Sequence, residues 1–154
     1  QMVFDEGLYD PANEPDIAYA YLFSRFPGEE WRTQREVRRL LAKYFTTAPD
    51  GIPGNDDTGT MSAWAVFSMM GFYPTCPGDL DYVLTSPTFN KVTIRLDEKF
   101  YPKGSLVIES GHRTPDDIYI KEVTADGKKL KGYTISQQEL VNAGTLRFTL
   151  DSKH

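Results

Sequence analysis

The chain has little cysteine, no excess of positive charge and no long apolar run. Its single cysteine, Cys76, excludes an internal disulfide, the usual staple of small secreted domains. The 17 lysines and arginines are outnumbered by 22 aspartates and glutamates, and they are scattered along the sequence. A nucleic-acid interface needs a basic stripe, so we expect no nucleic-acid partner. No apolar stretch approaches the roughly 18 residues that span a bilayer, so we expect no membrane span.

The remaining composition is that of a globular chain, and it divides into two regions. Hydrophobic residues make up 40% and charged residues 25% of the 154 residues, which leaves room for one ordinary domain or two small pieces. The apolar period changes near Pro74–Gly78. We therefore expect helices over residues 1–75 and a β-rich region over residues 76–154.

Three helices are predicted in the first region. Residues 31–46 carry one apolar stripe at helical spacing, and an earlier helix is expected from Pro15 to the Pro27-Gly28 stop. Residues 61–70 form the third, with Gly71 as its end, and this segment is polar only at two serines. A helix that is apolar nearly all round must be covered on all sides, and two amphipathic neighbours cannot do that.

The second region has the period of strands. Five segments are rich in β-branched and aromatic residues: 82–86, 92–96, 106–110, 118–124 and 146–150. Asp126-Gly127 predicts a tight hairpin, and Ser136 with Glu139 predicts a capping box before a short helix over 137–142. Helices followed by an antiparallel sheet indicate the α+β class.

Candidate chemistry is concentrated just before two of the helices. Asn55, Asp56 and Asp57 lie on a glycine-bounded loop that leads into helix 61–70, where free N–H groups favour an ionised carboxylate. The alternative is that Asp57 or Thr58 simply caps this helix. Asn13 and Glu14 precede the first helix, and their side-chain oxygens are ligands of the kind that calcium takes, although two are too few for a complete site.

Five motifs in order resemble one enzyme family. They are Asn13-Glu14-Pro15, W-x-T-Q-x-x-V-R at 31–38, G-N-D-D-T-G-T-M-S-A-W at 54–64, G-F-Y-P-T-C-P-G at 71–78 and S-P-T-F-N-K-V-T-I at 86–94. Together they resemble glycoside hydrolase family 92, the calcium-dependent, exo-acting α-mannosidases that are common in bacteria. The likeness runs from about Tyr9 to the C-terminus.

The resemblance implies that the chain is only the C-terminal fragment of such an enzyme. The family has an N-terminal β-sandwich followed by an (α/α)6 barrel, so residues 1–75 are expected to be about three helices from the end of that barrel. The general acid of the family is a glutamate, which we expect to lie upstream of Gln1. The fragment alone is therefore expected to be inactive, and its exposed apolar surface could lead to self-association.

The resemblance also assigns roles to residues of this chain. Asp57 matches the general base, with Asp56 in support, and Asn13 and Glu14 match the calcium site. Trp31 and Gln34 are candidates for substrate binding, with barrel packing as the alternative. The chain departs from the family in having Asn55 in place of an acid, Ala12 in place of a glycine, and no histidine soon after Pro15.

The function implied is calcium-dependent, inverting hydrolysis of α-mannosides, α-1,2 linkages first, in mannose-containing glycans such as N-glycans. The family acts on exported glycans, so a periplasmic or secreted location is expected. The alternative from another class is a stand-alone carbohydrate-binding or structural module without catalysis. A different inverting (α/α)6 hydrolase, such as a glucosidase or phosphorylase, is disfavoured only by the motifs.

Overall fold

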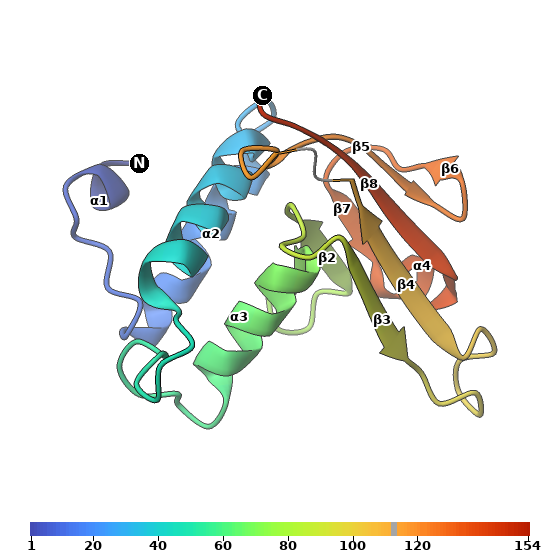
Figure 1. The fold of residues 1–154 in the computed structure, drawn as a ribbon, viewed down its shortest axis with the longest axis horizontal. Coiled ribbons are helices and arrows are strands. Elements are labelled where there is room, and N and C mark those ends of the chain that lie inside the picture. Colours follow the sequence, from blue (N-terminus) through green and yellow to red (C-terminus); the bar gives the residue numbers. More distant parts are fainter. Residues whose placement is uncertain (112–113) are drawn as a thin grey trace.

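The structure, a computed structural model, describes residues 1–111 and 114–154. Its first half is helical: α1 (Met2–Asp5), η1 (Glu14–Arg25), α2 (Glu30–Tyr44) and α3 (Thr60–Met70). Figure 1 shows these helices on one side of the molecule and most of the strands on the other. Within the described residues, no helix is long and apolar enough to cross a membrane.

Two sheets form the second half. β1 (Phe72–Tyr73), β2 (Asp81–Leu84) and β7 (Thr134–Ser136) make a three-stranded antiparallel sheet. The second sheet has the order β3 (Lys91–Arg95), β4 (Ser105–Ser110), β8 (Thr145–Asp151), β5 (Tyr119–Ala125) and β6 (Lys128–Lys129). The short helix α4 (Gln137–Asn142) follows β7 and has the predicted capping box of Ser136 and Glu139. The α+β class is confirmed.

The direction of one strand pair and the winding of one helix differ from the expectation, as do the additional helix α1 and the division of the strands into two sheets. The pair β4 and β8 is parallel, although the other pairs in both sheets are antiparallel. A strand period of two shows which face is buried but carries no information on strand direction. The helix that begins at the Glu14-Pro15 step is wound as a 3-10 helix over its whole length. An apolar pattern over three turns does not separate a period of 3.0 from one of 3.6.

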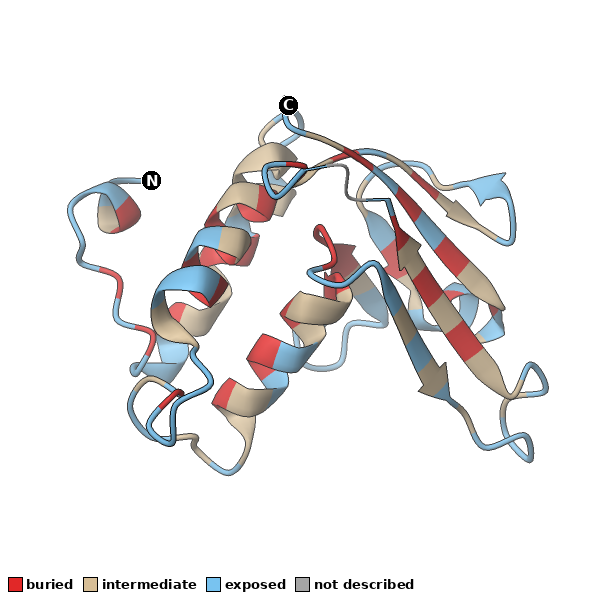
Figure 2. Ribbon diagram, in the orientation of Figure 1, coloured by how far each residue is buried: buried red, intermediate tan, exposed pale blue. Residues whose placement is uncertain are grey.

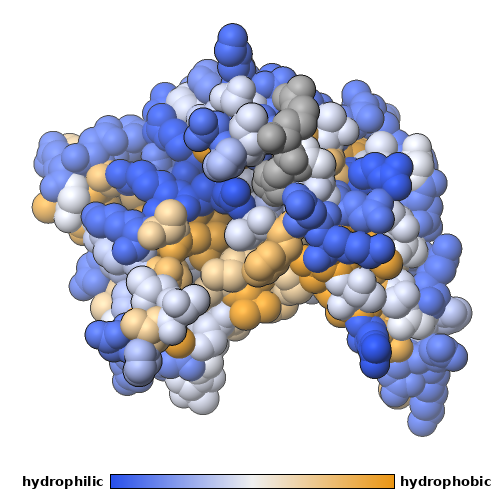
Figure 3. Space-filling view, in the orientation of Figure 1, coloured by the Kyte–Doolittle hydropathy of each residue, from blue (hydrophilic) through white to orange (hydrophobic). Residues whose placement is uncertain are grey.

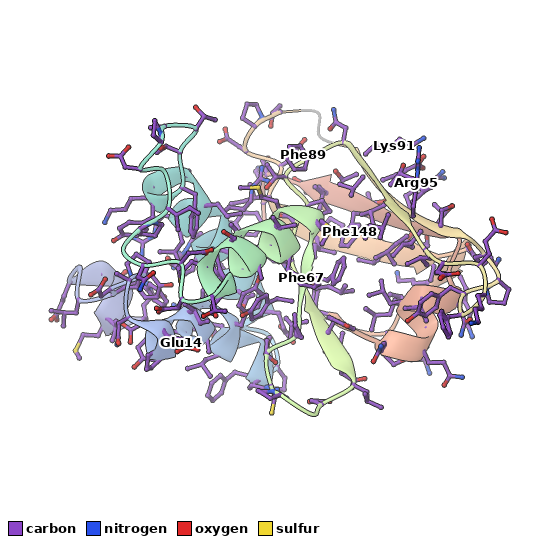
Figure 4. All side chains as sticks on the ribbon, turned by 90° about the horizontal axis from the view of Figure 1, so that it is seen from below. Glu14, Phe67, Phe89, Lys91, Arg95 and Phe148 are labelled. Atoms are coloured by element: carbon purple, nitrogen blue, oxygen red, sulfur yellow. The ribbon has the colours of Figure 1, made fainter. Side chains whose placement is uncertain are left out.

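Helix α3 lies between two apolar cores. On one side Trp64 and Ala65 are buried with Tyr21, Val37 and other residues of η1 and α2. On the other side Phe67 and Met70 pack against the core of the sheets, which includes Phe148 (Figure 4). Figure 2 shows the buried residues following one face of α2 and of α3 and alternating along β4 and β8. α3 therefore joins the helical half to the β half.

The predicted cover on all sides of α3 is not provided within the described residues. Val66 on this helix is 54% exposed, and Phe89, after β2, is 51% exposed. Figure 3 shows apolar side chains gathered in a hollow between the helical half and the five-stranded sheet. A contiguous apolar surface of this kind commonly marks a contact with another part of a protein. Self-association through it stays a prediction.

Candidate functional site

Two loops meet at the end of the helical half where α3 begins. One leads into η1 and carries Asn13, with Glu14 as the first residue of η1, and the other, residues 51–59, precedes α3. Their contact is close, because a Cβ atom added to Gly54 would lie 2.4 Å from Cβ of Ala12. Gly54 also has a φ of +64°, which a residue with a side chain seldom adopts. The fold therefore brings the two predicted parts of the site together.

Asp56 caps helix α3 from outside its first turn. Its Oδ1 atom accepts a hydrogen bond from the Ser62 amide at 2.8 Å, and its carbonyl accepts one from the Met61 amide at 3.2 Å. These are two of the amides at the start of a helix that have no partner within it. Neither Asp57 nor Thr58 caps the helix with its side chain, so that alternative is wrong in its choice of residue. Asp56 holds the loop on α3.

Asp57 is placed differently from its neighbour. Three successive residues, Asp57, Thr58 and Gly59, have left-handed φ angles of 46°, 62° and 93°. The Asp57 amide donates to Oδ1 of Asn55 at 3.4 Å, and its carbonyl accepts from both the amide and the hydroxyl of Thr60. Within the described chain, the half-buried Asp57 carboxylate has no hydrogen bond or ion pair. This leaves an acceptor beside the positive end of the α3 dipole.

The backbone at this turn is strained. A β-branched residue such as Thr58 rarely has a positive φ, and such a residue costs about 1–3 kcal/mol when the surrounding structure enforces it. The contacts that enforce it are the Asp56 cap and the hydrogen bonds to Thr60. Strain of this kind is common at functional sites, which agrees with the role that the resemblance gives to Asp57.

Asn13 and Glu14 are exposed at the start of η1. Nδ2 of Asn13 donates to Oδ1 of Asp16 at 3.0 Å, so its amide oxygen is directed elsewhere. Glu14 has no hydrogen bond or ion pair within the described residues, and it lies at the helical end of the molecule (Figure 4). Burial raises the pKa of Tyr73, and the charge of Glu14 raises it further. Tyr73, which stacks on Tyr21 at 4.8 Å, is therefore close to the same loop.

The described residues hold no cluster of three or more histidine, cysteine or acidic side chains that could bind a metal. The residues present nevertheless fit part of a calcium site, because the free amide oxygen of Asn13 and the unpaired carboxylate of Glu14 are adjacent hard donors. Calcium takes six to eight oxygens, so any further ligands would be carbonyls, waters or side chains from elsewhere.

Trp31 and Gln34 lie away from these loops. Both are at the start of α2, which adjoins the C-terminus at the opposite end of the helical half (Figure 1). The Trp31 ring stacks on His154 at 4.0 Å. Gln34 is buried, and its Oε1 accepts a hydrogen bond from the Ile120 amide on β5 at 2.8 Å. The structure does not bring either residue to Asp57.

Two residues near the site are given no role of their own by the sequence reasoning. Asp16 is 7% exposed and binds the loop that carries Asn13, and the pKa of Tyr73 is raised by burial and further by the charge of Glu14. The motif G-F-Y-P-T-C-P-G contains Tyr73 and was a signal for it. For Asp16, the signal in the sequence is an acid two residues after Glu14 with no lysine or arginine before Arg25. The sequence therefore offers it no nearby basic partner on the same helix.

Comparison with known proteins identifies the family of the chain. A model of the glycosyl hydrolase family 92 catalytic domain matches residues 1–152. The chain belongs to this family. It is therefore a family 92 chain in which the loops around Asn13 and Asp57 come together.

Solved family 92 structures share the fold. The α-mannosidase BT3965 of Bacteroides thetaiotaomicron has 31% identity with a TM-score of 0.84, over 94% of this chain. The inverting mannosidase BT2199 of the same organism has 34% identity with a TM-score of 0.78, over 92% of this chain. An uncharacterized secreted glycosidase of Arthroderma benhamiae is 28% identical over 95% of this chain. The chain spans only 18%, 19% and 19% of these three proteins, about a fifth of their length.

Proposed function

We propose that this family 92 chain is part of a calcium-dependent, inverting, exo-acting α-mannosidase, with α-1,2-mannosides in glycans as its first substrates. Its membership of the family supports the reaction class, and the two solved relatives named above are described as an α-mannosidase and an inverting mannosidase. One observation carries the assignment to a residue. The half-buried Asp57 carboxylate is unpaired within the described chain, on a strained turn at the start of α3.

Asp57 is the proposed general base. An inverting glycosidase needs one carboxylate that takes a proton from water and one carboxylic acid that protonates the leaving oxygen, about 6.5–9.5 Å apart. The water attacks the anomeric carbon from the face opposite the leaving group, and the water proton passes to Asp57. The acid is proposed to come from the part of the enzyme that relatives have and these 154 residues do not include.

Asp56 supports this role through the backbone. Its side chain already accepts the Ser62 amide, so it is less available than Asp57 for proton transfer. We infer that it holds the turn on which Asp57 is presented. Asn55, which binds the Asp57 amide, adds no second charge at this point.

Asn13 and Glu14 are proposed to hold the calcium ion. The ion would supply Lewis-acid and templating assistance by holding two neighbouring hydroxyls of the mannose ring. Glu14 has no hydrogen bond or ion pair within the described residues, so its carboxylate is available to the ion. The two loops meet at Gly54 and Ala12, so the sugar and the base would share one small region.

Trp31 and Gln34 are proposed to act mainly in packing and not in substrate binding. If either residue contacts a glycan, that glycan would extend from Asp57 to the N-terminal end of α2. The apolar hollow between the helical half and the five-stranded sheet is proposed to receive the remainder of the catalytic domain. A periplasmic or secreted location is proposed from the secreted fungal relative.

The test uses a protein extended to the length of its family 92 relatives. Hydrolysis of α-1,2-mannobiose is followed by proton NMR, with calcium and again with a chelator. We expect β-mannose as the first product, and we expect its release to stop with the chelator. Asp57→Asn should lower kcat by about 10²–10⁴-fold, the usual contribution of general acid–base catalysis.

The matched control is Asp50→Asn, which removes the same charge from an exposed position on the loop before Gly51. It should leave kcat unchanged. α-Mannose as the first product would contradict inversion, and full activity in the chelator would contradict the metal role. No hydrolysis of any mannoside would favour a carbohydrate-binding or structural module in place of an enzyme.

A further inference from the structure

Asp16 is the buried carboxylate closest in sequence to the proposed calcium donors, and it is turned inward. It is 7% exposed, and in the described structure no lysine or arginine forms an ion pair with it. Its two oxygens have separate partners on the preceding loop. Oδ1 accepts from Nδ2 of Asn13 at 3.0 Å, and Oδ2 accepts from the amide of Asp10 at 3.2 Å.

These bonds close the loop into one unit. The Asn13 amide donates to the carbonyl of Asp10 at 3.1 Å, and the Asp16 amide donates to the carbonyl of Asn13 at 2.9 Å. The Ala12 amide donates to Oδ1 of Asp10 at 2.9 Å. The backbone and side chain of Asn13 are therefore both fixed through residues 10–16.

The direction of the Asn13 bond has a chemical consequence. A carboxylate can only accept, so Asp16 selects the NH₂ group of the Asn13 amide and turns the amide oxygen away. The oxygen is the end that binds a hard cation, whereas the NH₂ group would repel it. On the basis of the proposed function, we propose that Asp16 is a positioning residue that makes Asn13 present its oxygen to calcium.

The substitution Asp16→Asn tests this geometry with little change in volume. An asparagine has one oxygen and one NH₂ group, but the loop offers two donors, the Asp10 amide and the Asn13 NH₂ group. If the substituted side chain keeps the Asp10 bond, its own NH₂ group faces Asn13, which must turn its oxygen inward. We expect calcium affinity to fall about 10- to 100-fold, as when other partners of metal ligands are removed.

Loss of negative charge alone would also weaken calcium binding, and a double-mutant cycle separates the two causes. In Asn13→Asp, two carboxylates face each other without a proton, and the Asn13–Asp16 hydrogen bond is lost. Adding Asp16→Asn to that variant restores the bond in the reverse direction, from the new amide at position 16 to the new carboxylate at position 13. The second oxygen of that carboxylate then faces outward. Asp16→Asn should therefore weaken calcium binding in the natural background and strengthen it in the Asn13→Asp background.

The measurement is calcium titration by calorimetry, with the calcium-induced rise in Tm as a second readout, in the length-extended protein. Asp50→Asn is the charge control. A decrease in affinity in both backgrounds would assign the effect to charge and overturn the positioning role, as would natural affinity in a folded Asp16→Asn variant. If Asp16→Asn does not fold, the double variant, which keeps both hydrogen bonds, must fold and bind calcium, and its failure to bind would overturn the proposal. Absence of calcium binding by the unmodified protein would instead overturn the metal part of the proposed function.

Discussion

The Asp56 carboxylate accepts a hydrogen bond from the Ser62 amide at 2.8 Å, whereas the carboxylate of Asp57, the next residue, is unpaired within the described chain. Two adjacent acids on one loop therefore have different roles. One satisfies the start of α3, and the other is available to a ligand. The distinction leads to different expectations for the two residues.

Asp56→Ala should lower the free energy of unfolding by about 0.5–2 kcal/mol, the usual cost of losing a helix cap. Asp57→Asn should change it by less than about 0.5 kcal/mol, because asparagine tolerates a positive φ and no side-chain bond is lost. Urea unfolding followed by circular dichroism measures both. Equal losses for the two variants would contradict this division of roles.

Thr58 offers a test of backbone strain. Its φ is 62°, and its side chain is exposed, so Thr58→Gly removes the strain without removing a buried contact. Relief of the backbone strain should stabilise the folded state by about 1–3 kcal/mol. The greater chain entropy that a glycine loses on folding costs about 0.5–1 kcal/mol, which is the smaller effect. We therefore expect a higher Tm for Thr58→Gly. Thr46→Gly, at a position that has no positive φ, should lower Tm, and a lower Tm for both variants would rule out strain at Thr58.

Gln34 is expected to act on stability. Gln34→Met keeps the volume but leaves the Ile120 amide without its partner inside the protein, at a cost of about 1–3 kcal/mol. KM for the mannoside should stay unchanged in the length-extended protein. The exposed Gln138→Met is the matched control and should be neutral in both assays. An increase in KM with natural stability would instead support the role in substrate binding.

Asp126 makes stability depend on pH at the other end of the molecule. Hydrogen bonds from the amides of Gly144 and Thr145, together with Lys103, hold the pKa of Asp126 below its usual range. A lowered pKa stabilises the folded state above the unfolded value of about 3.9, and this contribution is lost as pH falls through the lower, folded value. Asn also tolerates the positive φ of residue 126.

The natural chain should therefore lose stability more steeply than Asp126→Asn as pH is lowered from about 5 to about 2. Urea unfolding at a series of pH values measures the difference. Asp50→Asn, which removes an exposed carboxylate from a loop, should follow the natural chain. Parallel pH profiles for the natural chain and Asp126→Asn would show that the loop bonds do not depend on the charge.

Local patterns predicted the elements that local forces determine. The apolar stripe of α2, the Gly71 end of α3, the Asp126-Gly127 turn and the Ser136 capping box depend on neighbouring residues, and all four are present. The parallel pairing of β4 with β8 depends on segments nearly forty residues apart, and its direction leaves no mark on either strand.

The site followed the same rule. Motifs predict Asn13, Glu14 and Asp57 as site residues, because the proposed chemistry needs those residue types on those loops. The choice of Asp56 as the cap depends on the three left-handed residues that follow it, which shift the helix start away from Asp57 and Thr58. The inward turn of Asp16 depends on how residues 10–16 close on themselves. Neither is visible in residue type alone.

The close approach of Gly54 to Ala12 makes the two loops share a fixed volume. There is room for one methyl group between them, and Ala12 already occupies it. The sizes of residues 12 and 54 are therefore coupled. A bulkier residue at either position would push the two loops apart. The proposed calcium donors and the proposed base would then lie farther from each other, although none of those side chains had been changed.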